Sequence, residues 1–160
     1  MSIYITTSRK PYLLTRRLCK ILSKLFPNST QENRGKKSID EVFERAKLLG
    51  KRRTLLVYER NGNPSKILFM EIKGRSWNWL EHEFLISGIK FLKIPNEVPE
   101  EIKIEGENKA VLENLFDFET PESDEVTTLK ISNEELRFLH KGKEIGVKFK
   151  VELHGSKAES

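Results

Sequence analysis

Cysteine, histidine and long apolar runs are scarce in this sequence of 160 residues, and each shortage excludes a class of protein. Cys19 is the only cysteine, which rules out an internal disulfide and a cysteine-based zinc site. The three histidines, His82, His140 and His154, lie far apart and have no partner at metal-ligand spacing. No stretch approaches the ~18 consecutive apolar residues of a membrane-spanning helix. We therefore expect no cofactor, no bound metal and no membrane partner.

Signatures of catalysis and export are missing as well. The sequence has no glycine-rich phosphate loop of the Walker or Rossmann type. The acidic residues at 100–101 and 122–125 have the pattern of solvated loops rather than of metal sites. Residues 1–10 lack the long apolar run and the small-residue cleavage site of a secretory signal. We predict a protein that is not an enzyme and that is cytoplasmic, or nucleolar if its source were eukaryotic.

Positive charge is abundant, but it is concentrated in one part of the chain. The net charge is +5, yet residues 1–53 hold 14 Lys and Arg against 4 Asp and Glu, whereas residues 54–160 hold 15 against 20. Concentrated positive charge suits a polyanion, because each neutralised phosphate releases condensed counterions. The alternative is an ordinary solvated surface. The one-sided excess over some fifty residues favours a polyanion partner such as a nucleic acid.

Hydrophobic spacing predicts two helices and three strands in the first part of the chain. The first helix, residues 14–26, carries apolar side chains at helical spacing and basic side chains on another face. A capping box of Ser38 and Glu41 begins the second helix, which ends at Gly50. Pro11 suits the first turn of the first helix. Strands are expected at residues 3–7, 55–58 and 67–72, a polar loop at 28–37 and a turn at 61–64.

The remaining residues contain more strand than helix. Ser87 and Gly88 indicate a bulge or a turn within a strand. A helix is predicted at residues 108–118, between a linker at 95–99 and an acidic loop at 119–125. Strands are expected at 77–80, 84–92, 102–104, 126–131, 136–140 and 145–153, and a frayed polar tail from about Gly155. Strand–helix–strand order therefore occurs twice, although residue identity between the two parts is too low to establish a duplication.

Several short motifs follow one another at a recognisable spacing. They are TTSRKP at residues 6–11 followed by Thr15 and Arg16, FPNS at 26–29, NRGK at 33–36, NGNP at 61–64, and residues 110–118 before the strand at 129–132. This series resembles the Brix-domain proteins, a family of ribosome-biogenesis factors. The likeness covers nearly the whole chain and is most specific in roughly its first 70 residues.

The resemblance implies a mixed α/β fold of two similar small halves with mixed sheets, akin to the anticodon-binding domain of certain aminoacyl-tRNA synthetases. It implies a single Brix domain over residues 1–160, with a basic half at 1–75 and an acidic half at 76–155. Eukaryotic members usually carry long extensions outside the domain, so this chain resembles the minimal, archaeal-type version. No catalytic activity accompanies the family.

The implied function is binding of precursor ribosomal RNA, or of a guide RNA, during subunit assembly and rRNA processing. Ribosomal proteins and other assembly factors are further candidate partners. An alternative is a protein-interaction adaptor that docks such proteins through the acidic second half, and the acidic loop at 119–125 favours it. A membrane-surface protein that uses the basic helix carries less weight, because the apolar face of that helix is needed to cover a sheet. Nothing in the sequence suggests the fourth option, an enzyme built from scattered carboxylates.

The candidate RNA-binding residues gather around the first strand and helix. A helix N-terminus carries partial positive charge and favours phosphate, and an arginine can donate two hydrogen bonds to one phosphate. The predicted RNA-binding residues are Ser8, Arg9, Lys10, Arg16, Arg17, Lys20, Arg34, Lys36 and Lys37. The simpler interpretation is that Ser8 and Thr15 only cap or pin the helix and that the arginines are solvated. Base stacking by Trp77, Trp79 and Phe91 is a weaker hypothesis than a role in the core.

Overall fold

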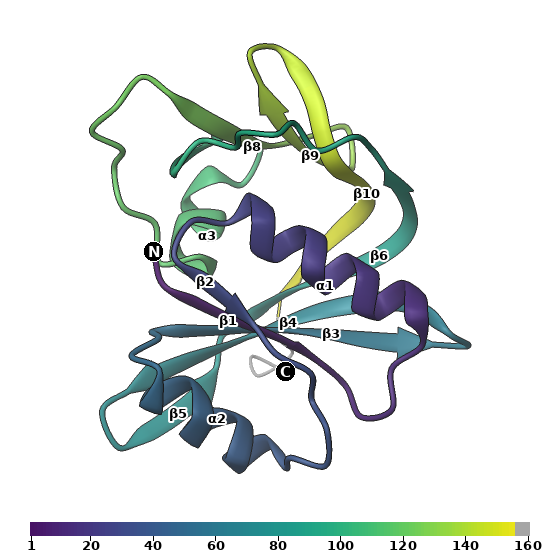
Figure 1. Cartoon of the computed structure of the whole chain (residues 1–160), viewed down its shortest axis with the longest axis vertical. Helices are drawn as coiled ribbons and strands as arrows, with labels where there is room; N and C mark the ends of the chain where they lie inside the picture. The colour runs from purple at the N-terminus through teal and green to yellow at the C-terminus, as the bar shows by residue number, and fades with distance from the viewer. Residues whose placement is uncertain (156–160) are drawn as a thin grey trace.

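The computed structural model describes residues 1–155, in which one continuous sheet carries three helices (Figure 1). The strand order is β2-β1-β3-β4-β6-β10-β9-β8-β7, and β5 pairs with β4 outside this path. The elements in chain order are β1 (Ile3–Thr7), α1 (Leu13–Leu25), β2 (Ser29–Gln31), α2 (Ile39–Leu48), β3 (Arg53–Arg60), β4 (Asn63–Lys73), β5 (Ser76–Trp79), β6 (His82–Phe91), β7 (Glu101–Gly106), α3 (Lys109–Leu115), β8 (Val126–Ser132), β9 (Glu135–His140) and β10 (Lys143–Gly155).

The sheet is built from two units of similar plan. In the first unit β1 runs parallel to β2 and β3, and β4 returns antiparallel to β3. In the second unit β7 runs parallel to β8, and β9 and β10 follow antiparallel. β6 and β10 join the units through nine antiparallel residue pairs. The predicted mixed α/β class and the twofold strand–helix–strand order are confirmed, whereas the division into a basic half at 1–75 and an acidic half at 76–155 stays a prediction.

The main core lies between the two units. Figure 1 shows α1 between the strands of the first unit and those of the second, and α1 contacts β10 as well as β1. The ring of Phe26, just after α1, stacks on Phe116 with centroids 4.9 Å apart and meets Phe138 of β9 edge-on at 5.4 Å. Phe69 of β4 packs edge-on against Phe116 at 5.1 Å. One aromatic cluster therefore holds both units together, and each such pair contributes about 0.5–1.5 kcal/mol beyond its area burial.

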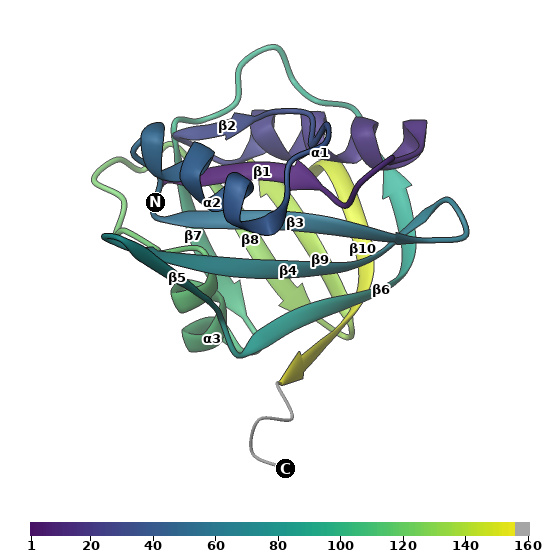
Figure 2. The same ribbon diagram turned by 90° about the horizontal axis from the view of Figure 1, so that it is seen from below.

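A second, smaller core lies on the other face of the first unit. There α2 packs its buried Val42, Phe43 and Ala46 against Tyr4 of β1 and Leu56 of β3. Figure 2 shows α2 in front of β1 and β3 on this side of the sheet. The first unit is thus covered on both faces, which fixes the positions of the loops at the end of β1 and before α2.

Most of the predicted elements are present, with some differences. The capping box of Ser38 and Glu41 is formed in both directions, as predicted. The predicted bulge is also present, because Lys150 pairs with Gly88 and Val151 with Ile86, which leaves Ser87 as the extra residue. The loop expected at 28–37 contains the short edge strand β2. Pro11 precedes the N-cap of α1 rather than occupying its first turn. The predicted polar tail beyond Gly155 lies outside the described residues.

Candidate nucleic-acid interface

The chain between β1 and α1 forms the first loop of the predicted interface. Ser8 is half-buried, and its backbone N–H donates to the carbonyl oxygen of Val57 at 2.9 Å, which keeps the loop on the sheet for one residue beyond β1. Lys10 takes a left-handed conformation with φ of 53°, so the chain turns sharply there. Arg9 and Lys10 are both exposed. The loop therefore carries two adjacent cations at the point where the strand meets the helix.

Arg34 is buried and holds the second loop of the interface in place. Its side chain is only 4% exposed. Its Nη1 donates to the carbonyl oxygen of Thr7 at 2.9 Å, and its Nε donates to that of Lys37 at 2.7 Å. Burial lowers the pKa of its guanidinium. The sequence predicts Arg34 as a phosphate contact, but the structure directs its hydrogen bonds to backbone carbonyls, so we assign it a positioning role.

The two loops form one surface. Gly35 has φ of +59° and lets the second loop turn tightly after Arg34. Lys36 is exposed at the tip, and Lys37 is half-buried with its Nζ 3.5 Å from the carbonyl oxygens of Asn33 and Arg34. The Nε of Arg9 donates to the carbonyl oxygen of Lys37 at 3.4 Å and so joins the loops.

The outer face of α1 continues this surface. Arg16, Arg17 and Lys20 are all exposed. The guanidinium carbon of Arg17 lies 4.1 Å from the centre of the Phe91 ring, so this arginine also covers the end of β6. Lys20 and Lys37 line one hollow of about 640 Å³, together with the paired Glu32 and Arg45. The structure therefore brings the loop cations and the helix cations together. We call this set the basic surface: Arg9, Lys10, Arg16, Arg17, Lys20, Lys36 and Lys37.

The N-terminus of α1 is occupied by a carboxylate that sequence reasoning did not find. Tyr12, not Ser8, precedes the helix, and its backbone N–H donates to Oε2 of Glu59 at 2.7 Å. The hydroxyl of Thr15 donates to the same oxygen. A negative group at this end interacts favourably with the helix dipole. The interpretation that Thr15 pins the helix is thus what the structure shows, and the helix N-terminus that was predicted to favour phosphate already holds a carboxylate. No local signal pairs Glu59 with residues so distant in sequence.

A half-buried network of side chains lies next to the basic surface. Glu32 follows β2 and accepts hydrogen bonds from Nε and Nη2 of Arg45 at 2.8 and 2.7 Å and from the hydroxyl of Tyr4 at 2.8 Å. The Arg45 guanidinium is the main cause that lowers the pKa of Glu32 to about 2, and the Tyr4 hydroxyl adds to it. The network ties α2 to β1 and β2. It also neutralises Arg45, which leaves this arginine out of the basic surface.

The lone cysteine and the tryptophan pair of β5 contribute to the fold. Cys19 is buried, and burial raises the pKa of its thiol to about 12. Trp77 packs against the smaller core, and its Nε1 donates to Oδ1 of Asp40 at 2.9 Å. Trp79 is exposed and meets Trp77 edge-on at 5.2 Å. Over residues 1–155 no three His, Cys, Asp or Glu side chains gather as they would around a metal ion. The helices of this same range are too short or too polar to span a bilayer.

Comparison with known proteins places the chain in a family. No family model matches the chain. A probable Brix domain-containing ribosomal biogenesis protein of Methanosarcina mazei is 31% identical over 169 residues, which cover 96% of this chain and 98% of the relative. Proteins of the same description from Saccharolobus solfataricus and Thermococcus kodakarensis are 39% and 37% identical over 54% of this chain. The match spans only 49% and 41% of the lengths of these two relatives.

Solved structures share the fold. A probable ribosomal biogenesis protein of Aeropyrum pernix superimposes with a TM-score of 0.82 at 21% identity, covering 98% of this chain and 97% of that protein. The archaeal Imp4-like protein Mil superimposes with a TM-score of 0.73 at 22% identity, covering 96% of this chain and 99% of Mil. The fold implied by the sequence motifs is confirmed by these superpositions. Together with the full-length likeness to the Methanosarcina protein, they show that the chain belongs to the Brix domain-containing ribosomal biogenesis proteins.

Proposed function

We propose that this protein is a non-catalytic, cytoplasmic assembly factor that binds precursor ribosomal RNA or a guide RNA through the basic surface. One observation carries the proposal. Within residues 1–155, none of the seven cations of the basic surface forms an ion pair within 4 Å of a carboxylate. In the second unit Lys103, Arg137 and Lys148 are each paired with a glutamate, and the exposed lysines without an ion pair, such as Lys109 and Lys141, lie apart on α3 and on the turn between β9 and β10. Unpaired positive charge gathered on one surface is what a phosphate backbone requires.

The arrangement supports phosphate contact more than base-specific readout. The cations come from two loops joined by the bond from Arg9 and from one face of α1, so they cover an area rather than converge on one point. The buried Arg34 fixes the two loops relative to each other through its hydrogen bonds to Thr7 and Lys37. Contacts of this kind position an RNA and make its affinity strongly dependent on salt.

The test is RNA binding as a function of salt. An Arg9→Ala, Lys10→Ala, Lys36→Ala variant removes three exposed cations and leaves the buried Arg34 intact. We expect it to bind a ribosomal RNA fragment roughly 10- to 100-fold more weakly, with a salt slope about 2 smaller, because each phosphate contact contributes roughly 0.7–0.9 to that slope.

The matched control is a Lys109→Ala, Lys141→Ala, Lys143→Ala variant, which removes the same charge from exposed positions in the second unit. We expect it to bind nearly as the wild type does. Equal losses in both variants would mean that net charge alone matters. Binding of the first variant at wild-type affinity, or no binding by the wild type, would overturn the proposal.

A second candidate function is docking of a basic ribosomal protein or assembly factor. The observation that favours it is a hollow of about 470 Å³ in which three glutamates, Glu97, Glu100 and Glu125, outnumber the one cation, Lys141. If this candidate holds, the protein should retain a ribosomal protein in a pull-down after nuclease treatment, and a variant with all three glutamates changed to Gln should lose it. Loss of the partner on nuclease treatment alone would show that RNA bridges the two.

A further inference from the structure

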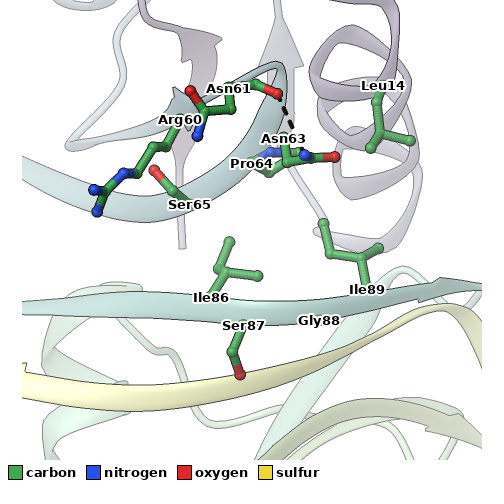
Figure 3. Close-up of a pocket in the computed structure, with 10 residues that line it drawn as sticks. All are labelled: Leu14, Arg60, Asn61, Asn63, Pro64, Ser65, Ile86, Ser87, Gly88 and Ile89. Atoms are coloured by element: carbon green, nitrogen blue, oxygen red, sulfur yellow. Dashed lines mark hydrogen bonds between the residues drawn. The ribbon is translucent and has the colours of Figure 1, made fainter.

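A cleft of about 410 Å³ opens beside the first turn of α1 (Figure 3). The hairpin between β3 and β4 lines one side, β6 lines the other, and Leu14 of α1 closes one end. The cleft lies where β4 and β6 separate, because these strands pair only at Lys66–Leu85 and Ile67–Phe84, whereas β6 stays paired with β10 from His82 to Phe91. The two strands therefore diverge towards the hairpin, where the cleft opens.

The lining of the cleft combines apolar walls with polar groups that carry no negative charge. Figure 3 shows Ile86 and Ile89 pointing into the space from β6, whereas Ser87 points away from it. Pro64 and Leu14 complete the apolar part. On the hairpin side the cleft is lined by Arg60, Asn61, Asn63 and Ser65. A side-chain amide offers both donors and acceptors.

An exposed aromatic ring stands at the tip of the same hairpin. Tyr12 is 66% exposed, and its ring lies on the backbone of Gly62, where an added Cβ would come within 3.0 Å of Cδ2. Arg9 and Lys10 precede Tyr12 in the chain, and Arg16 follows one turn later. The cleft and the ring therefore border the basic surface, which relates the cleft to whatever that surface binds.

We propose that this cleft receives an unstacked nucleobase of the bound RNA, with Tyr12 as a stacking surface beside it. The inference rests on the proposed function and deepens it, because it names an unpaired, single-stranded segment as the RNA that this end of the basic surface holds. The volume lies within the ~300–1,000 Å³ of small-molecule sites. The apolar walls can pack against the flat faces of a base but not against a phosphate. The side-chain amides can hydrogen-bond to the polar edge of the base. Proteins that bind single-stranded RNA use aromatic and apolar surfaces in this way.

The experiment compares two probes with the same number of phosphates: an eight-residue oligouridylate and an eight-residue abasic oligomer. We expect the wild type to bind the oligouridylate about tenfold more tightly at equal salt, since stacking on one base is typically worth that much. Ile89→Trp fills the cleft, and it should bring this ratio close to one without changing the affinity for the abasic oligomer. Tyr12→Ala should lower the ratio, and Tyr12→Phe should keep it.

Leu139→Trp is the matched control, because it adds the same side chain to a half-buried strand position in the second unit. It should keep the wild-type ratio. If Ile89→Trp fails to fold in a thermal melt, Asn63→Ala tests the cleft instead from an exposed position. Equal binding of both oligomers by the wild type, with a normal salt dependence, would overturn the proposal that the cleft receives a base. It would leave the proposed function standing. No binding of either oligomer or of a ribosomal RNA fragment would overturn both.

Discussion

At the scale of single residues, Arg34 shows how a side chain can serve the basic surface without belonging to it. Its N–H groups donate to the carbonyl oxygens of Thr7, at the end of β1, and of Lys37, in the loop before α2. Buried carbonyls that lose their donors cost about 1–3 kcal/mol each. Lys36, two residues away, is exposed and contributes charge instead. Neighbouring residues of one motif therefore have different physical roles.

We expect Arg34→Met to lower the free energy of unfolding by about 2–4 kcal/mol, because methionine keeps apolar volume but donates no hydrogen bond. Urea denaturation measures this loss. Lys36→Met is the control and should change stability by no more than about 0.5 kcal/mol, while it weakens RNA binding. Equal stability of the two variants would show that the bonds of Arg34 do not support the loop.

Glu32 makes stability depend on pH in a defined window. Its pKa falls from an ordinary 4.5 to about 2 in the folded protein, first through the hydrogen bonds of Arg45. Because the folded pKa is the lower one, its contribution is fully present above pH 4.5 and is lost as the pH falls towards 2. We expect Glu32→Gln to lose about 1 kcal/mol at pH 7, a figure kept small because both partners are partly solvated. The difference from wild type should vanish near pH 2.

The measurement is urea denaturation of both proteins at a series of pH values. Glu152→Gln serves as the control, since this exposed glutamate lies in β10 away from the network. Its stability should follow that of the wild type across the series. A Glu32→Gln deficit that stays constant from pH 7 to pH 2 would mean that the charge of Glu32 does not contribute.

At the scale of elements, the sequence predicts the features that depend on neighbouring residues. It does not predict those that depend on contacts between residues far apart in the chain. The capping box at Ser38 and the bulge at Ser87 follow from local chemistry, and both are present. The edge strand β2 was missed because Ser29, Thr30 and Gln31 show no apolar alternation, and only pairing with β1 makes them a strand. Likewise, no local signal distinguishes the buried Arg34 from an exposed arginine.

The contact between α1 and β10 depends on a glycine. Gly146 has φ of +74°, and a Cβ there would lie 2.7 Å from Cδ1 of Leu25 in α1. Gly142 has a similar φ of +79° but open space around it. Both Gly→Ala changes carry the conformational cost of a left-handed residue, roughly 1 kcal/mol. Only Gly146→Ala also overpacks the core, by about 1–3 kcal/mol more.

We therefore expect Gly146→Ala to be the more destabilising of the two in thermal or urea unfolding. The comparison isolates packing, because the backbone conformation is nearly the same at both sites. If the two variants lose equal stability, α1 can move away from β10 at no cost, and the packing of the two units is looser than the structure shows.

At the scale of the whole molecule, charge counts predict where cations are abundant along the chain but not which of them remain free to contact RNA. Arg52 and Arg53 belong to the same basic segment as Arg9, yet Arg52 pairs with Asp117 at 2.9 Å. Arg53 is buried and donates to the carbonyl oxygen of Asn114 through Nε and Nη2. These arginines connect the first unit to the end of α3. Such pairings come from the tertiary arrangement, so a count along the sequence overestimates the charge that can face RNA.

The clustering of unpaired cations on the basic surface predicts that bound RNA covers one side of the molecule. Bound RNA should protect Lys10, Lys20 and Lys36 from acetylation, because these amines face solvent without a carboxylate partner in the described chain. Lys103 and Lys148 should react equally with and without a ribosomal RNA fragment, since their glutamate partners lie at 2.8 and 3.5 Å. Mass spectrometry of peptides labelled at low salt measures each site. Equal protection of both groups would mean that RNA wraps around the second unit as well, and the unpaired charge of the basic surface would no longer explain where RNA binds.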